Sequence, residues 1–210
     1  MPTVMGFRCR DGIVLCADQQ VPNTSASKSH ERTITVEVEE HQSIVLAYSG
    51  LPSLARKFRK EIRNKIGHAE IPSDLLYLAA DEVLADMSRR NSNMDLQLLI
   101  GRAAFCEAPA LFQFDGSALR VADDFSFLGT GHSSSFRFQA QTMYSPQMNI
   151  EEATNLAIYL IHKAGQFMNM DIYGGPMNAA IIKCGDESCQ ILLEEDILKR
   201  LRTGISKLIL

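Results

Sequence analysis

A threonine close to the N-terminus has the most distinctive potential chemistry in this sequence. The chain begins Met1-Pro2-Thr3. A threonine hydroxyl becomes a nucleophile when a base removes its proton, and the α-amine of the same residue can be that base once the residue stands first in the chain. Thr3 would have to lose Met1 and Pro2 to reach that state. The other interpretation is a β-branched residue that begins a strand, and the residue type alone favours neither.

The cysteines and histidines indicate less. Five cysteines occur without a CxxC pair or a zinc-type spacing, and we expect them to be reduced, apolar core residues: Cys9, Cys16, Cys106, Cys184 and Cys189. The histidines have no metal-ligand spacing, so we expect no metal site, and we expect no cofactor. His132 follows a Gly-Thr-Gly stretch, where a histidine is more typical of a surface or capping residue than of a general base.

Length, composition and charge exclude several classes of protein. The 210 residues suffice for one domain, which we expect to span residues 1–210. A hydrophobic content of 46% and a charged content of 22% are typical of a soluble globular chain. The net charge of −4 gives no reason to expect a nucleic-acid partner. Without a signal-peptide pattern or an apolar run of spanning length, we expect a cytoplasmic protein with no membrane partner.

The elements that must position these residues follow from periodicity. Two short β-type runs joined by Asp11-Gly12 predict a hairpin, because glycine accepts the positive φ of a tight turn. A second strand pair is predicted over 32–38 and 43–50. Four-residue apolar spacing predicts a helix over 54–66, and Ser73 is the predicted N-cap of the next helix. Strands are predicted over 96–105, 110–115, 118–122 and 125–131, helices over 133–144 and 150–168, then strands over 178–184 and 189–195 and a last helix over 194–208.

This order of strands, two helices, strands, two helices and strands indicates the architecture. Strands grouped in hairpins and helices grouped in pairs favour antiparallel sheets with helices on their outer faces, and they disfavour a parallel βαβ fold. We therefore predict an α+β protein built as a four-layer αββα sandwich. We also expect the hairpin around Asp11-Gly12 to lie at the edge of the active cleft.

Four stretches in a fixed order carry a resemblance to a known family. They are "DGIVLCAD", "LAYSG" before a long helix, "FLGTGHSS", and the helix "EEATNLAIYLIHKA" that leads into "DIYGG". With these landmarks the whole chain resembles the proteasome family of N-terminal nucleophile hydrolases, especially β-type subunits and their simpler bacterial homologues. The short segment before the first strand is closer to the bacterial homologues, in which one subunit type builds the assembly.

The resemblance implies roles for several residues. In this family a free N-terminal threonine supplies both the nucleophile and, through its amine, the base. Asp18 ends "IVLCAD" and matches the aspartate that pairs with a lysine. Gly50 in "AYSG" matches the glycine whose N–H stabilises the oxyanion. Thr130 in "GTGH" stands where the family has a serine of the hydrogen-bond network, and Asp171 matches the second aspartate of that network.

Three positions depart from the family pattern. Counting back from Asp18, the nucleophile position falls on Pro2, with Thr3 one residue further in. The paired lysine falls on Arg32, which can hold a salt bridge to Asp18 but does not exchange a proton. A serine that follows the second aspartate falls on Gly174, which has no hydroxyl.

The resemblance therefore implies one function and leaves alternatives open. The first is a threonine-type peptidase, with Thr3 as nucleophile, that hydrolyses unfolded polypeptides inside a ring of identical subunits, with an ATPase unfoldase as a further partner. The second is a catalytically silent structural subunit of such a ring. A small-molecule amidase on the same fold is the third. For the basic helix face between Arg56 and Lys65, the expectation is a solvated surface or a contact with a neighbouring subunit.

Overall fold

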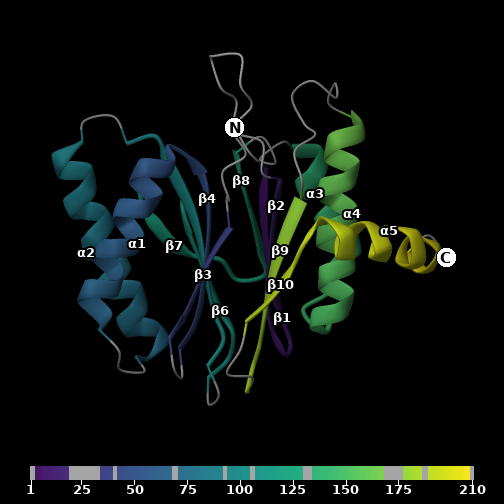
Figure 1. Ribbon diagram of the computed structural model, residues 1–210, viewed down its shortest axis with the longest axis horizontal. Coiled ribbons are helices and arrows are strands. Elements are labelled where there is room, and N and C mark those ends of the chain that lie inside the picture. The colour runs from purple at the N-terminus through teal and green to yellow at the C-terminus, as the bar shows by residue number, and fades with distance from the viewer. Residues whose placement is uncertain are drawn as a thin grey trace.

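The computed structural model describes residues 3–18, 34–39, 42–67, 71–91, 94–104, 107–129, 134–167, 177–185 and 189–208. Two five-stranded antiparallel sheets lie face to face, and helices cover the outer side of each (Figure 1). The predicted α+β, four-layer αββα sandwich is confirmed.

The first sheet has the strand order β10-β9-β2-β1-β8. Its strands are β1 (Val4–Cys9), β2 (Gly12–Asp18), β8 (Phe125–Leu128), β9 (Met177–Lys183) and β10 (Cys189–Leu192). Every residue of β2 is buried, because the strand lies at the centre of this sheet and is covered on one face by α4 and on the other by the second sheet. A strand covered on both faces has an almost continuous apolar sequence, as "GIVLCA" has.

The second sheet has the strand order β3-β4-β5-β6-β7. Its strands are β3 (Ile34–Glu39), β4 (Gln42–Gly50), β5 (Leu96–Arg102), β6 (Ala110–Phe114) and β7 (Leu119–Val121). The order of the strands in this sheet is the same as their order in the chain. The sheet is therefore a simple meander, interrupted after β4 by two helices.

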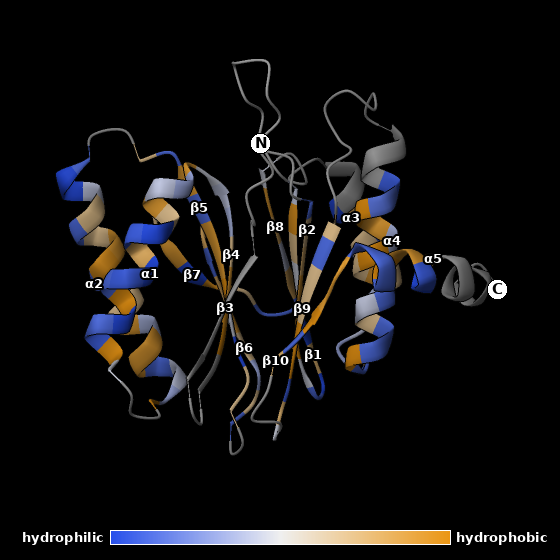
Figure 2. Cartoon of the chain, in the orientation of Figure 1, coloured by the Kyte–Doolittle hydropathy of each residue, from blue (hydrophilic) through white to orange (hydrophobic). Residues whose placement is uncertain are grey.

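Five helices occur in the described part of the chain: α1 (Pro52–Ile66), α2 (Ser73–Arg90), α3 (Ser134–Met143), α4 (Ile150–Phe167) and α5 (Glu194–Leu208). The pair α1 and α2 covers the second sheet, while α3 and α4 cover the first, and α5 extends outward from α4 (Figure 1). The apolar stripes of the helices face the sheets (Figure 2). No helix among the described residues has the length and apolar character that a membrane span requires.

The contact between the sheets sets their relative register. It is formed by aliphatic side chains at alternate strand positions, among them Val4, Leu15, Ala47, Leu99 and Ala180. A Cβ added to Gly101 would lie 2.5 Å from Ile13 Cγ2 and 3.0 Å from Val45 Cγ1. Ile13 therefore packs on Gly101 and its strand partner Val45. A Cβ added to Gly6, the partner of Leu15, would lie 2.9 Å from Leu99, the partner of Ala47. The two contacts show that β2 and β4 run in the same direction and bring Asp18 and Gly50 to the same end of the sandwich.

The Asp11-Gly12 turn has a different place from the one expected. Cys9 pairs with Gly12 at one end of the hairpin, whereas Val4 pairs with Ala17 at the other. The turn is therefore at the far end of the strands from Thr3 and Asp18, and the expectation that it borders the cleft is wrong. Instead it anchors α4, because Asp11 Oδ1 accepts a hydrogen bond from the Ile150 N–H at 2.8 Å.

The start of α2 also differs from the prediction. Pro72 occupies the N-cap position and Ser73 is the first helical residue. The Ser73 N–H and hydroxyl both donate to the Glu107 carboxylate, at 3.0 and 2.8 Å, and buried Arg102 donates to the same carboxylate and to the Ser73 hydroxyl. A distant carboxylate thus satisfies the helix terminus that a local side chain was expected to cap.

Candidate active site

Thr3 and Asp18 form a pair at the open end of the β1–β2 hairpin. The Asp18 N–H donates to the Thr3 carbonyl at 3.1 Å, and the Thr3 N–H donates to Asp18 Oδ2, also at 3.1 Å. The Asp18 carboxylate thus accepts the hydrogen bond that the backbone carbonyl of Asp18 would accept in a regular antiparallel ladder. The α-nitrogen of Thr3 is therefore held next to the aspartate that sequence comparison selects as part of the site.

Both residues of this pair are buried. Thr3 is 0% exposed and Asp18 is 6% exposed. A carboxylate in such a position requires hydrogen bonds or a cation, because an isolated buried charge is costly. Burial, with a smaller contribution from Asp18, raises the pKa of the neighbouring Cys16 thiol to about 12. Cys16 is therefore an unreactive core thiol, as expected from the sequence.

The face on which Thr3 lies follows from strand alternation. Val4 packs between the two sheets, whereas Met5 packs on the helix side, under α4. Successive side chains of a strand point to opposite faces, so Thr3 shares the helix-facing side with Met5.

Gly50 lies on the second sheet at the same end of the sandwich. It ends β4 opposite Leu96 and has a φ of 114°, a conformation that L-residues with a side chain rarely adopt. A Cβ added there would lie 2.4 Å from the Asp95 carbonyl oxygen. That carbonyl accepts a hydrogen bond from Leu51 N–H at 2.8 Å, which ties the end of β4 to the start of β5. Gly50 is thus required for a tight approach of two backbone segments.

Polar side chains at inward strand positions mark this end of the space between the sheets. Ser49 and Asn178 are 0% and 4% exposed and have the parity of inward residues, and Asn178 pairs with Ala17 beside Asp18. Gln97 Oε1 accepts a hydrogen bond from Gly129 N–H at 2.9 Å and so links the two sheets. No sequence motif singles out these residues. The signal that the sequence does carry is a polar residue at an inward position of an otherwise apolar strand, as in "NAAIIKC".

The remaining predicted site residues lie outside the described residues. These are Arg32, Thr130 and Asp171, together with Pro2 and Gly174 at the family positions that depart from the pattern. The structure therefore brings Thr3 and Asp18 into direct contact and places Gly50 at the same end of the sandwich. The ion pair between Asp18 and Arg32 stays a prediction, as do the roles of Thr130 and Asp171. Within the described ranges, no three metal-ligating side chains gather into a group.

Comparison with known proteins shows which proteins this chain is similar to. The family model described as Proteasome subunit matches residues 2–182. The chain is 28% identical over 206 residues to the proteasome subunit alpha of Methanobrevibacter smithii, covering 93% of this chain and 78% of the relative. It is 25% identical over 197 residues to the proteasome subunit beta 1 of Thermococcus onnurineus, covering 93% and 94%.

Solved structures share the fold at lower identity. Anbu, described as an ancestral beta-subunit, from Yersinia bercovieri superposes with a TM-score of 0.76 at 14% identity, covering 99% of this chain and 96% of that one. A structure described as a helical assembly of the Anbu complex from Pseudomonas aeruginosa has a TM-score of 0.70 at 14% identity, covering 99% and 95%. At this identity the likeness concerns the fold alone.

Proposed function

This chain belongs to the proteasome family, and from that premise we propose that it is a subunit of a ring-shaped, self-compartmentalising protease. The peptidase form uses Thr3 as its nucleophile and acts on unfolded polypeptides in the cytoplasm, supplied by an ATPase unfoldase. The observation that supports this proposal best is the 3.1 Å hydrogen bond from the Thr3 α-nitrogen to the buried Asp18 carboxylate. It keeps the nitrogen that would become the catalytic amine beside the aspartate that the family uses.

Processing at the N-terminus is the condition for this chemistry. In the chain as translated, the Thr3 nitrogen is a peptide N–H and cannot accept a proton. Attack of the Thr3 hydroxyl on the Pro2 carbonyl, followed by hydrolysis of the resulting ester, would break the Pro2–Thr3 bond and leave a free amine on Thr3. Removal of Met1 alone would stop at Pro2, which has a secondary amine and no hydroxyl.

The processed site would then work by general base and oxyanion catalysis. The Thr3 amine takes the hydroxyl proton as the oxygen attacks a substrate carbonyl, and later returns that proton to the leaving amine. The Gly50 N–H donates to the oxyanion that forms. Arg32 pairs with Asp18 and keeps the local charge positive, which favours the neutral form of the amine. Thr130 and Asp171 complete the hydrogen-bond network around the Thr3 amine.

A second candidate is the catalytically silent subunit, and a specific observation favours it. Thr3 has no exposed surface and has the helix-facing parity of Met5, while Pro2 occupies the family's nucleophile position. In the unprocessed chain Thr3 therefore has the structural role of a strand residue paired with Asp18. The two candidates share the fold and the assembly and differ in the state of the N-terminus.

The intact mass of the purified protein, measured together with hydrolysis of fluorogenic peptides, tests the proposal. A mass that starts at Thr3, with hydrolysis that Thr3→Ala abolishes and Thr142→Ala preserves, supports the peptidase. Thr142 is a suitable control because it is exposed on α3 and its hydroxyl donates to the Phe138 carbonyl of the same helix at 2.9 Å. A mass that starts at Pro2, with no hydrolysis and no reaction with a boronate directed at N-terminal threonine, supports the silent subunit.

A further inference from the structure

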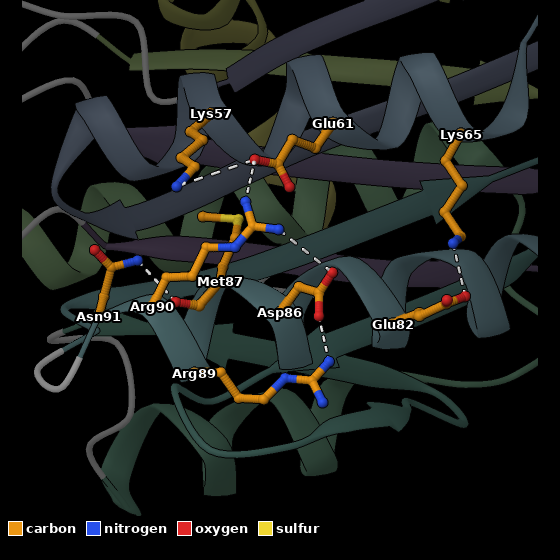
Figure 3. Close-up of polar contacts among 9 residues, drawn as sticks. All are labelled: Lys57, Glu61, Lys65, Glu82, Asp86, Met87, Arg89, Arg90 and Asn91. Atoms are coloured by element: carbon orange, nitrogen blue, oxygen red, sulfur yellow. Dashed lines mark hydrogen bonds and ion pairs between the residues drawn. The ribbon is translucent and has the colours of Figure 1, made fainter.

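The carboxamide of Asn178 in β9 differs from those of two other asparagines. Asn91 at the C-terminal end of α2 donates from Nδ2 to the Met87 carbonyl at 2.7 Å (Figure 3), and Asn149 Oδ1 accepts a hydrogen bond from the Glu152 N–H at 2.9 Å. Asn178 is only 4% exposed, yet no residue that the structure describes donates a hydrogen bond to its Oδ1. Buried polar atoms rarely lack a partner, so this unpaired acceptor requires an explanation.

Two glutamines between the sheets show that this region does satisfy the amides that it contains. Gln97 Oε1 accepts a hydrogen bond from the Gly129 N–H at 2.9 Å, and Gln113 Oε1 accepts one from the Ser126 hydroxyl. Both glutamines belong to the second sheet, and both donors lie in β8 of the first sheet or directly after it, so each bond links the two sheets. Within the described part of the chain, Asn178 Oδ1 has no such link.

Asn178 lies close to the candidate active site. It pairs with Ala17, which pairs in turn with Val4, so these three residues form one row across the first sheet. Asn178 is therefore one row inward from Thr3 and two strand spacings from β1, a separation of roughly 10 Å. Like Ala180, it has the parity of the residues that face the second sheet.

The neighbours of Asn178 select the class of group that fits its carbonyl oxygen. The inward residues of β2 and β9 around it are all apolar, and neither of these two described strands has a charged residue at an inward position: Leu15, Ala17, Ala180 and Ile182. A charged group would lose its hydration there without compensation. The acceptor therefore fits a neutral hydrogen-bond donor such as a primary carboxamide, and the separation from β1 favours glutamine, which has the longer of the two carboxamide side chains.

We propose that Asn178 is a specificity residue of the protease, whose Oδ1 accepts a hydrogen bond from the carboxamide of a substrate glutamine that immediately precedes the scissile bond. This inference rests on the proposed function and names the substrate preference of the same site. With Thr3 as the nucleophile and the Gly50 N–H at the oxyanion, the carbonyl of that substrate residue lies between these two groups. Its side chain then enters the space between the sheets toward Asn178.

The proposal predicts that Asn178 lowers the stability of the protein without substrate. A buried, unpaired acceptor costs free energy, whereas an apolar side chain of similar size does not. Asn178→Val should therefore raise Tm by about 2–4 °C. Gln113→Val is the matched control, because it introduces the same β-branched residue into the same space but removes the acceptor of the buried Ser126 hydroxyl. This control should lower Tm.

Hydrolysis of three fluorogenic peptides, which differ only in having glutamine, glutamate or leucine before the scissile bond, tests the preference directly. Glutamate has nearly the shape of glutamine but is charged at pH 7 and has no donor, and leucine has neither donor nor charge. For the parent, we expect kcat/KM of the glutamine peptide to be at least about tenfold above the other two. Asn178→Val should lose that ratio, as should Asn178→Ala, which removes the carboxamide without adding volume. Gln113→Val should keep it.

Each other outcome overturns a defined step. A parent that hydrolyses none of the peptides overturns the proposed protease function and, with it, this substrate preference. A parent that hydrolyses the peptides without favouring glutamine, or a ratio that survives in both Asn178 variants, overturns the specificity role and leaves the protease function standing. A Tm that falls in Asn178→Val shows that the carboxamide is already satisfied inside the protein, and its role is then structural.

Discussion

The conformation of Gly50 makes a prediction in which two physical costs can be separated. Its φ of 114° disfavours any side chain, and a Cβ there would lie 2.4 Å from the Asp95 carbonyl oxygen and 3.1 Å from the Leu96 Cα. Both neighbours are backbone atoms, which cannot move away as the end of a flexible side chain can. Gly50→Ala therefore combines backbone strain with a steric clash.

The magnitude follows from these two terms. Holding a residue other than glycine in a sparsely populated backbone region costs of order 1–3 kcal/mol, and overpacking costs typically about 1–3 kcal/mol. Gly50→Ala should therefore lower the free energy of unfolding by about 2–6 kcal/mol. Gly67 is a matched control, because it has a φ of 65° and nothing within 4 Å of an added Cβ. Gly67→Ala should cost only the conformational term, of order 1–3 kcal/mol.

Thermal unfolding of the parent and the two variants measures the difference. For a domain of this size, 1 kcal/mol shifts Tm by roughly 2–4 °C, so Gly50→Ala should melt well below Gly67→Ala. The same variants also report on function, since the Gly50 N–H is the proposed oxyanion donor and Gly67 at the end of α1 has no such role. Equal Tm values for the two variants would show that the backbone around Gly50 and Asp95 shifts enough to remove the clash. The proposed positioning of the Gly50 N–H would then be refuted.

Three further predictions concern polar and thiol groups. Arg102→Ala should lower the free energy of unfolding by about 1–3 kcal/mol in a urea titration, because it removes a buried donor from Glu107. Asp115→Ala should lower Tm at pH 7, because hydrogen bonds, chiefly from the Ser117 hydroxyl, stabilise the ionised carboxylate and hold the pKa of Asp115 at about 2 instead of 3.8. This stabilisation exists only while Asp115 is ionised, so the difference in Tm should disappear as pH falls from about 4 to about 2. Cys16, whose pKa is raised to about 12 by burial, should resist iodoacetamide at pH 8 in the native state and react only after denaturation, as peptide mass spectra would show.

Most of the fold could be predicted because its signals are local. The apolar period of four in α1, the continuous apolar run in β2 and the Asp-Gly turn each follow from a few neighbouring residues. The predicted last helix, 194–208, has the same bounds as α5. The helices predicted over 133–144 and 150–168 differ from α3 and α4 by one residue at their ends. Such elements depend on backbone geometry and side-chain pattern within the segment.

What the sequence did not predict depends on residues far apart in the chain. The carboxylate that satisfies the start of α2 belongs to Glu107, 34 positions after Ser73. Similarly, the sequence predicts only a turn at Asp11, whereas its carboxylate also accepts a hydrogen bond from the N–H of Ile150, 139 positions away at the start of α4. Local capping rules cannot supply a partner from another element, so these contacts had to come from the three-dimensional arrangement.

Whether Thr3 can act as the nucleophile also depends on residues far apart in the chain, because the register between β1 and β2 decides which face Thr3 occupies. The antiparallel pairing of Val4 with Ala17 fixes Thr3 opposite Asp18, and the period of two in a strand then decides which face each residue occupies. A displacement of one residue exchanges the faces, and Thr3 has the helix-facing parity of Met5. Sequence counting places the threonine within one residue of the family's nucleophile position, and in a strand a shift of one residue exchanges the inward face for the helix side. For Thr3 to act on a substrate, its freed end must turn away from the ladder while its nitrogen stays near Asp18. Removal of Met1 and Pro2 would give it that freedom, because Thr3 would then be a chain end with no peptide bond before it.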